Sequence, residues 1–278
     1  MKARVLFGVG GFLFVLLALY VLPPVVLAVA LTTLGAVAAY ELTVPTGLVK
    51  NKQVRSTCTT AALIIGAMVA IEGAIFPQAD AKNSMLFLAA LVLLYFFGFF
   101  ALLLRNHDTV TFPEIVTAMF GGVVLPLLLL SLWRIFAMDG GEFLVLLPLV
   151  AAWGSDTCAL FAGMAFGKHK LAPVISPKKT VEGAAGGVLG ATVLMLLVVY
   201  LFNTHAGLDI HYGAAALMGA VGAVIGQVGD LSFSIIKRQT GIKDYGHIFP
   251  GHGGVLDRFD SVIFVAPVAE LILRAFGA

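Results

Sequence analysis

Charged residues are scarce in this sequence of 278 residues, of which only 12% are Asp, Glu, Lys or Arg. Soluble domains carry about 25%, and the mean hydropathy of this chain is +1.03. The net charge is only +2, and no run of basic residues is interleaved with aromatic ones, so no nucleic-acid partner is expected. The shortage of charge and the long apolar runs exclude a water-soluble domain.

Cysteine is also scarce. Cys58 and Cys158 are the two cysteines, and both sit in or beside apolar segments without the spacing of a zinc site. We expect two buried thiols rather than a disulfide.

Nine apolar segments are long enough to cross a bilayer, which takes roughly 17–25 residues of helix. Lipid offers the backbone no hydrogen-bond partners, so these segments are expected to be helices. The sequence therefore predicts an all-α polytopic integral membrane protein with about nine transmembrane helices. The first segment has the charge pattern of a signal peptide, but its apolar run is longer, and we interpret it as a retained span. The segments are 4–20, 25–43, 57–76, 84–104, 114–133, 142–166, 182–202, 213–236 and 260–276.

The basic residues support this arrangement. With nine spans, 14 of the 17 Lys and Arg residues fall on the side of the N-terminus, and only Lys82, Arg134 and Arg274 fall on the other. The positive-inside rule makes the basic side, and with it the N-terminus, cytoplasmic. The loops on that side are 44–56, 105–113, 167–181 and 237–259.

Small residues recur where helices are expected to pack closely. They are Ala162, Gly163, Gly186, Gly187, Gly222 and Gly226. We divide the chain into residues 1–140, mainly a scaffold of transmembrane helices, and residues 141–278, a catalytic region that includes the loops 167–181 and 237–259.

The stretch 226–260 holds 4 of the 15 acidic residues and 4 of the 17 basic ones. Asp230 lies about two turns inside the cytoplasmic end of its apolar segment, where an isolated carboxylate would cost several kcal/mol. Asp230 is therefore either neutralised by a neighbouring Lys or Arg, or part of a functional site. At helical spacing, one small and polar face gathers Gly222, Gly226, Asp230, Ser234 and Lys237.

The glycine-rich loop 251–254 is able to form an anion-binding nest, and Lys, Arg and His flank it. Beyond it, Asp257 and Asp260 are spaced to share one helix face, although Asp260 could serve only as an N-cap. If the helices of Asp230 and Asp257 pack together, the two carboxylates could bind one Mg²⁺.

A second group of polar residues surrounds the loop 167–181. Asp156 lies inside an apolar run and is a site candidate by default. Ser176, Lys178, Lys179 and Thr180 precede a helix start and suit a polyphosphate, although such lysines can also set topology or touch anionic lipid. Glu41, at the end of the second segment, is a candidate to line the same cavity.

The run from Ser234 to Asp260 resembles the signature of the phosphatidate cytidylyltransferases, also called CDP-diacylglycerol synthases. Ser155-Asp156 and the block 176–180 resemble the family's other recurring motif, so the resemblance covers essentially the whole chain. It implies transfer of CMP from CTP to phosphatidic acid, giving CDP-diacylglycerol and pyrophosphate. Because CTP is a cytoplasmic solute and phosphatidate is a bilayer lipid, the active site is expected at the cytoplasmic face of the membrane. The compact size suggests a bacterial inner-membrane enzyme.

The resemblance also implies site residues. Mg²⁺ would be held by Asp230 and Asp257, with room for a second cation such as K⁺, and the partners would be CTP, phosphatidic acid and membrane lipids. A homodimer is plausible for the family. The predicted catalytic residues are Asp230, Asp257, Lys237, Arg238, Lys243, Asp244, His252, Arg258 and Asp260. The predicted substrate-binding residues are Asp156, Ser176, Lys178, Lys179, Thr180, Ser234, Gly253 and Gly254.

Three other functions remain open at this point. A transporter or channel would use Asp156 and Asp230 as ion-coupling groups, but the polar residues gather at one face and no inverted repeats are visible. A CTP-using lipid kinase or a CDP-alcohol transferase is a second alternative. The latter is expected to have Asp-Gly-x2-Ala-Arg before paired aspartates, which Asp257-Arg258-Phe259-Asp260 does not match. A non-catalytic assembly protein that holds anionic lipid is the third.

Overall fold

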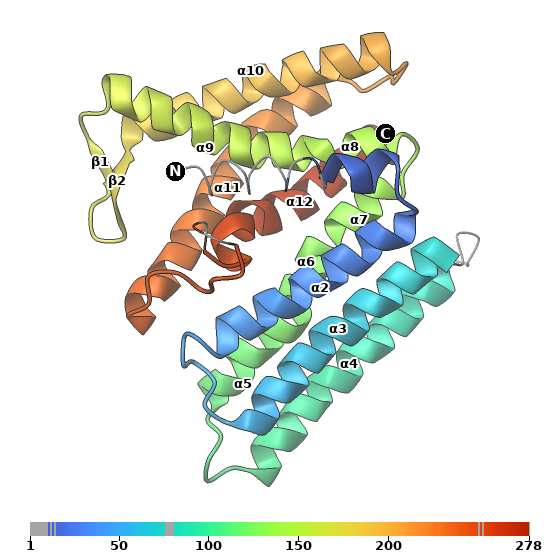
Figure 1. The fold of residues 1–278 in the computed structure, drawn as a ribbon, viewed down its shortest axis with the longest axis vertical. Coiled ribbons are helices and arrows are strands. Elements are labelled where there is room, and N and C mark those ends of the chain that lie inside the picture. The colour runs from blue at the N-terminus through green and yellow to red at the C-terminus, as the bar shows by residue number, and fades with distance from the viewer. Residues whose placement is uncertain are drawn as a thin grey trace. The chain divides into compact units, whose positions relative to one another are not determined.

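A computed structural model of the chain describes residues 11, 13, 15–75, 81–249, 251 and 253–277. The described chain divides into two compact units (Figure 1). Unit 1 is the N-terminal part up to Trp133 together with Thr240–Arg258, and unit 2 is Arg134–Gln239 together with the segment from Phe259 onward. The predicted division into a scaffold (1–140) and a catalytic region (141–278) is a statement about function, which these two units do not test. It stays a prediction.

Unit 1 is built from long apolar helices. α2 (Pro24–Thr43), α3 (Lys52–Ile75) and α4 (Ala81–Arg105) follow one another, and α3 packs against both of its neighbours (Figure 1). Pro24 is the first residue of α2, a position where a proline sacrifices no helical hydrogen bond. The interior of the unit is apolar, and Leu42, Ile65 and Phe99 are fully buried there.

The segment predicted at 114–133 is helical but not regular. It consists of α5 (Phe112–Met119), the π-helix η1 (Phe120–Val124), α6 (Leu125–Leu129) and α7 (Ser131–Phe136). Pro126 has no N–H to donate to the preceding turn, and a π-turn is a common adjustment at such a point. Gly122 lies tightly against α3, since a Cβ added there would be 2.6 Å from the carbonyl oxygen of Cys58.

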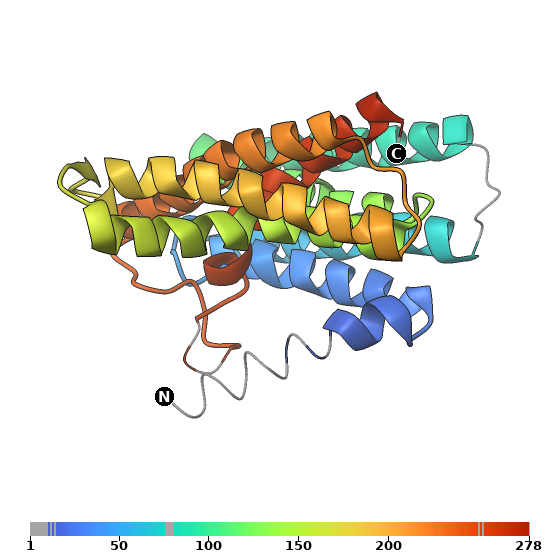
Figure 2. The same ribbon diagram turned by 90° about the horizontal axis from the view of Figure 1, so that it is seen from above.

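Unit 2 contains the helical pair that frames the predicted site. α8 (Gly141–Leu144) leads into α9 (Leu146–Phe166), and α9 lies alongside α10 (Val181–His205) in both views (Figure 1, Figure 2). A Cβ added to Gly186 would be 2.2 Å from the Cβ of Ala162. The close helix packing predicted from the small residues is confirmed. α11 (Tyr212–Thr240) and α12, which runs from Leu256 in unit 1 to Phe276, complete the helices.

A short antiparallel hairpin connects α9 to α10, where the sequence predicted only a loop. β1 (Lys170–Ala172) pairs with β2 (Ser176–Thr180), with Lys170 opposite Thr180 and Ala172 opposite Ser176. The strands are short, rich in lysine and without alternating hydrophobicity, so the usual strand signal was absent. The hairpin fixes the direction of the β2 side chains, which a mobile loop would not.

The predicted all-α polytopic membrane fold is confirmed. Seven helical segments of the described part are long and apolar enough to cross a membrane. They match seven of the nine predicted segments to within about five residues. The last predicted segment forms α12, which is helical but carries more charge, and most of the first lies outside the described residues. The count of nine therefore stays a prediction.

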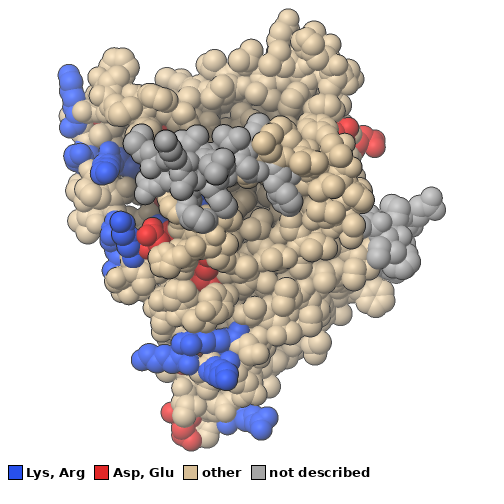
Figure 3. Space-filling view, viewed as in Figure 1, with Lys and Arg blue, Asp and Glu red and all other residues tan. Residues whose placement is uncertain are grey.

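Basic residues gather at one end of each unit. In unit 1 they lie where α3 begins and α4 ends, at Lys50, Lys52, Arg55 and Arg105. In unit 2 they lie on the hairpin and in the last turn of α11. Figure 3, seen from the same side as Figure 1, shows the Lys and Arg side chains in blue over these two regions. Much of the rest of that face has none. Each unit separately has the charge asymmetry that the positive-inside rule associates with a cytoplasmic end.

Close packing of α11 on α12 is expected to set the stability of unit 2. A Cβ on Gly229 would lie 2.7 Å from the carbonyl oxygen of Asp260 and 3.0 Å from the ring of Phe264. Gly229→Ala should therefore destabilise the protein by about 1–3 kcal/mol, measured as a lower Tm in detergent. Gly98→Ala, where a Cβ meets nothing within 4 Å, is the control. Equal Tm values for the two variants would contradict close packing at Gly229.

Candidate active site

The centre of the candidate site in unit 2 is an ion pair between Lys179 and Asp230. Lys179 comes from strand β2 and Asp230 from α11, and their side chains are 27% and 23% exposed. The hydroxyl of Ser234, one turn further along α11, donates a hydrogen bond of 3.3 Å to Oδ1 of Asp230. One alternative from the sequence was that a neighbouring Lys or Arg neutralises Asp230, and the pair with Lys179 agrees with it. That alternative did not include the other charged side chains nearby.

Two further carboxylates lie within electrostatic range of Asp230. They are Asp156 on α9 and Asp260 on α12, and together with Asp230 they form what we call the acidic cluster. Lys179 interacts electrostatically with Asp156, and Lys237 with Asp260. Three helices and the hairpin thus bring three carboxylates and two ammonium groups to one place.

Tight packing among the helices holds the acidic cluster in position. Gly226 of α11 faces Val265 and Ser261 of α12, and Gly222 faces Ala151 of α9. Gln227, beside these glycines, donates its amide to the carbonyl oxygen of Ala184 at 3.1 Å. The small polar face predicted for α11 is therefore the surface along which it packs on its neighbours.

Asp260 is not a helix cap. α12 begins at Leu256, so Asp260 lies in its second turn rather than at its N-cap, and that alternative prediction is wrong. Oδ1 of Asp260 accepts hydrogen bonds from the backbone N–H (2.7 Å) and the hydroxyl (3.3 Å) of Ser261. Lys237 and Arg238, predicted to begin a loop, are in the last turns of α11, which ends before Gly241 (φ +73°).

The other predicted residues of unit 2 have varied surroundings. Arg238 donates from Nε to the carbonyl oxygen of Ile175 at 3.2 Å, which joins α11 to the hairpin turn. Thr180 is buried and caps α10 by accepting from the N–H of Gly183 at 3.1 Å. Ser176 is half-buried on β2 and Lys178 is exposed there. Their predicted roles in substrate binding stay predictions.

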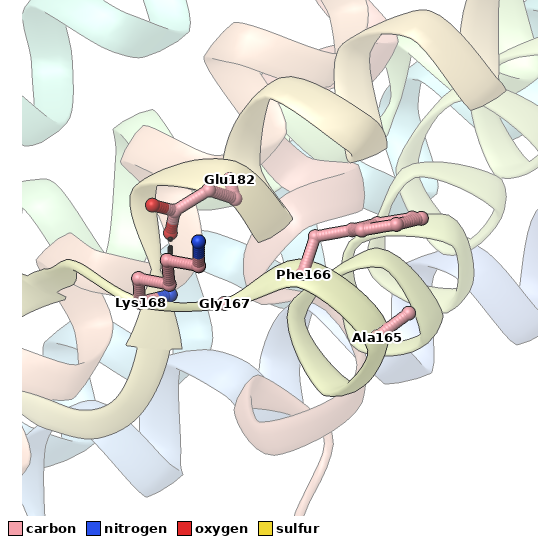
Figure 4. Close-up of a pocket in the computed structure, with 5 residues that line it drawn as sticks. All are labelled: Ala165, Phe166, Gly167, Lys168 and Glu182. Atoms are coloured by element: carbon pink, nitrogen blue, oxygen red, sulfur yellow. Dashed lines mark hydrogen bonds between the residues drawn. The ribbon is translucent and has the colours of Figure 1, made fainter.

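An open pocket of about 400 Å³ lies at the start of α10 (Figure 4). Glu182 accepts hydrogen bonds from the backbone N–H groups of Lys168 (3.0 Å) and His169 (3.2 Å) there. The imidazole of His169 contacts the same carboxylate. Because a carboxylate already binds these amides, the pocket is a poor place for a phosphate. Its lining residues are Ala165, Phe166, Gly167, Lys168 and Glu182.

In unit 1, the described residues of the segment 241–255, which we call the signature loop, fold around Asp257. Oδ2 of Asp257 accepts hydrogen bonds from the backbone N–H groups of Tyr245 (2.8 Å) and Gly254 (2.9 Å). Tyr245 is fully buried, and Gly253 has a φ of +85°, where an added Cβ would lie 2.7 Å from Oδ2 of Asp257. The loop does bind an anion through its amides, and in this structure that anion belongs to the chain.

A second carboxylate, that of Glu41 at the end of α2, binds the same loop. Oε1 accepts from the N–H of Val255 at 3.0 Å, and Oε2 from that of Leu256 at 2.9 Å. The sequence placed Glu41 only as a candidate to line a cavity. No local pattern links it to a loop more than 200 residues away, and the one available signal was an acidic residue at the end of an apolar segment.

The remaining predicted residues of this region include several at the surface. Lys243, Asp244 and Arg258 are exposed in unit 1. His252 lies outside the described residues, so its predicted role is neither supported nor opposed. Binding of substrate by Gly253 and Gly254 stays a prediction.

The acidic cluster has the donor chemistry of a Mg²⁺ site. Among the described residues, no three His, Cys, Asp or Glu side chains are gathered closely enough to hold a metal ion by themselves. Mg²⁺ does not require this, since it is usually bound by one or two carboxylates with waters and substrate phosphates. Asp230 already directs its carboxylate at a cation, the ammonium group of Lys179. The residues present therefore fit the ion.

Both cysteines are free thiols, and Cys58 is buried as predicted, whereas Cys158 is only half-buried.

Comparison with known proteins agrees with these features. The model of the cytidylyltransferase family matches residues 2–276. The phosphatidate cytidylyltransferase of Bacillus subtilis (strain 168) is 34% identical over 281 residues, covering 100% of this chain and 99% of that protein. The one from Rickettsia felis is 37% identical over 174 residues, covering 61% of this chain and 76% of that protein.

A further relative, the phosphatidate cytidylyltransferase of Staphylococcus aureus (strain COL), is 41% identical over 133 residues, covering 48% of this chain and 50% of that protein. The matches extend along the whole chain and include a full-length relative, which confirms the resemblance found in the run from Ser234 to Asp260. The chain belongs to the cytidylyltransferase family.

Proposed function

We propose that this protein is a phosphatidate cytidylyltransferase, which transfers CMP from CTP to phosphatidic acid. The observation that carries the proposal is the acidic cluster of Asp156, Asp230 and Asp260 facing Lys179 and Lys237. It occurs in a chain whose full-length relative is named a phosphatidate cytidylyltransferase. A site with both signs of charge in a membrane protein suits a reaction between a nucleotide and an anionic lipid.

The reaction joins two polyanions. An oxygen of the phosphatidate phosphate attacks the α-phosphorus of CTP, the bond from that phosphorus to the bridging oxygen breaks, and pyrophosphate leaves with the electron pair. The phosphate monoester is already ionised near pH 7, so no strong general base is required. The barrier is mainly one of charge and position, and we assign Lys179 and Lys237 to reduce the repulsion and orient the phosphates.

We propose that catalysis depends on Mg²⁺ held by Asp230 and Asp257, with Asp260 and Asp156 adding negative charge beside Asp230. The ion would supply electrostatic stabilisation for the charge that develops on the phosphate oxygens. Lys179 would then exchange its contact with Asp230 for one with a phosphate of CTP. A second cation such as K⁺ remains part of the proposal, with no described residue singled out to bind it.

The proposed location follows from the charge asymmetry of each unit. The basic ends would face the cytoplasm, where CTP is dissolved, and phosphatidic acid would enter sideways from the leaflet. We place the protein in a cell membrane, the inner one in bacteria, with the N-terminus and active site cytoplasmic. Membrane lipids are expected neighbours, and a homodimer stays a prediction.

The test of the proposed reaction uses purified protein in detergent with radiolabelled CTP, with and without phosphatidic acid and Mg²⁺. We expect labelled CDP-diacylglycerol only when both are present. Asp230→Asn and Asp257→Asn should each lower kcat by about 10²-fold or more, because each removes charge that binds the ion. Tm measurements verify that both variants fold.

Full activity in both folded variants would remove the metal assignment and keep the enzyme. An absence of product from folded wild-type protein, together with cation-dependent transport in vesicles, would favour a transporter instead.

Replacement of Lys179 tests its predicted role with the nucleotide. Lys179→Met removes a charge-assisted contact worth about 1.5–3 kcal/mol, so KM for CTP should rise roughly 10- to 100-fold. Lys170→Met is the matched control, because Lys170 is an exposed lysine on the other strand of the same hairpin. It should leave KM close to that of the wild type. Equal KM values for the two variants would show that Lys179 acts only as the structural partner of Asp230.

A further inference from the structure

Glu41 is a charged residue buried without a salt bridge to any described residue. It is only 1% exposed, although it lies in a helix whose other buried side chains are almost all apolar. Both of its carboxylate oxygens accept backbone N–H groups, those of Val255 and Leu256. Burying a carboxylate costs free energy unless it is hydrogen-bonded, so the two hydrogen bonds are needed to keep Glu41 buried at this position.

The position of these amides makes the contact stronger. Leu256 is the first residue of α12, whose N-terminus carries unsatisfied N–H groups and a partial positive charge. Glu41 therefore supplies from α2 a second anion at the start of α12, in addition to Asp257 in the first turn of that helix. Charge-assisted hydrogen bonds of this kind are roughly twice as strong as neutral ones.

The backbone around Glu41 is shaped to admit it. A Cβ added to Gly246 or to Gly254 would lie 2.3 Å from Oε1 of Glu41. Two glycines of the signature loop are thus required for the approach of this carboxylate, in addition to any contact with substrate. Val255 and Leu256 are themselves buried beside it.

Asp257 and Glu41 hold the loop together from two sides. Gly254 donates its N–H to Asp257, and the next two residues donate theirs to Glu41. Three consecutive amides, from Gly254 to Leu256, are therefore bound by two carboxylates. One is on α12, and the other is more than 200 residues earlier in the chain.

We propose that Glu41 is a positioning residue for the cytidylyl transfer: it fixes the signature loop and the start of α12, and thereby the direction of the Asp257 side chain. This rests on the proposed function. Glu41 touches neither substrate nor reacting atoms in this role. A misplacement of about 1 Å away from the chemistry can lower a rate about 10²-fold.

Glu114 offers a matched control in the same unit. It is 5% exposed, and its Oε1 accepts the backbone N–H groups of Lys50 (2.6 Å) and Asn51 (3.3 Å). Like Glu41 it is a buried carboxylate that binds a loop through amides, but its loop lies between α2 and α3. Loss of either carboxylate should have a similar effect on stability, and only loss of Glu41 should disturb the signature loop.

The experiment compares Glu41→Gln, Glu41→Asp and Glu114→Gln with the wild type. Gln keeps the size of the side chain but places an amide group, which donates, against one of two N–H donors. We expect Glu41→Gln to lower kcat about 10²-fold, and Glu41→Asp, which keeps the charge on a shorter side chain, to recover part of that loss. Glu114→Gln should stay within a few-fold of the wild type, at a Tm similar to that of Glu41→Gln.

Hydrogen–deuterium exchange provides a readout that does not need activity. Glu41→Gln should speed exchange at the amides of 254–256, whereas Glu114→Gln should speed it at 50–51. Activity in Glu41→Gln equal to that of Glu114→Gln, or unchanged exchange at 254–256, would overturn the inference. An inactive wild type with the expected exchange pattern would instead overturn the proposed function and leave the structural role of Glu41 intact.

Discussion

The ion pair between Lys179 and Asp230 is the contact on which the arrangement of unit 2 depends. An ionised carboxylate inside an apolar helix is costly unless a partner of opposite charge reaches it. The hairpin β1–β2 provides that partner by holding Lys179 against α11. The glycines of α11 then allow α9 and α12 to approach, and their own carboxylates join the same cluster. The three carboxylates need positive charge beside them, and Lys179 and Lys237 provide it. A reaction between phosphate groups can use both the carboxylates and the ammonium groups.

Unit 1 also contains carboxylates away from water, and backbone amides stabilise them in place of lysines. Glu41 and Asp257 both accept N–H groups of the signature loop or of the first residue of α12, so two carboxylates help to determine the shape of this loop. Because carboxylates already bind the amides of Tyr245, Gly254, Val255 and Leu256, these four N–H groups first serve the fold. Side chains around the loop, rather than these amides, are then left to meet the phosphates of a substrate.

The sequence predicted the helices well because their signal is local. Apolar runs of fixed length located seven spans and α12, and spacing of three and four residues placed Asp230 and Ser234 on one helix face. The hairpin was missed because its strands are short and polar. The partners of Asp230 and the role of Glu41 were missed because they depend on contacts between distant segments, which no periodicity encodes.

The same distinction explains the small errors at helix ends. Asp260 could be read as a cap because a helix boundary is uncertain by a few residues, and α12 begins one turn earlier than the apolar pattern indicated. Pro126 was visible in the sequence, but neither the π-helix before it nor the close packing of Gly122 on α3 was predicted.

The most direct test of cytidylyl transfer follows the label of CTP into the lipid. Purified protein, phosphatidic acid and Mg²⁺ are incubated in parallel with CTP labelled at the α-phosphate and with CTP labelled at the γ-phosphate. Cytidylyl transfer predicts label in the lipid product only from the α position, with the γ label recovered in pyrophosphate. Lipid labelled from the γ position would identify a lipid kinase and contradict cytidylyl transfer.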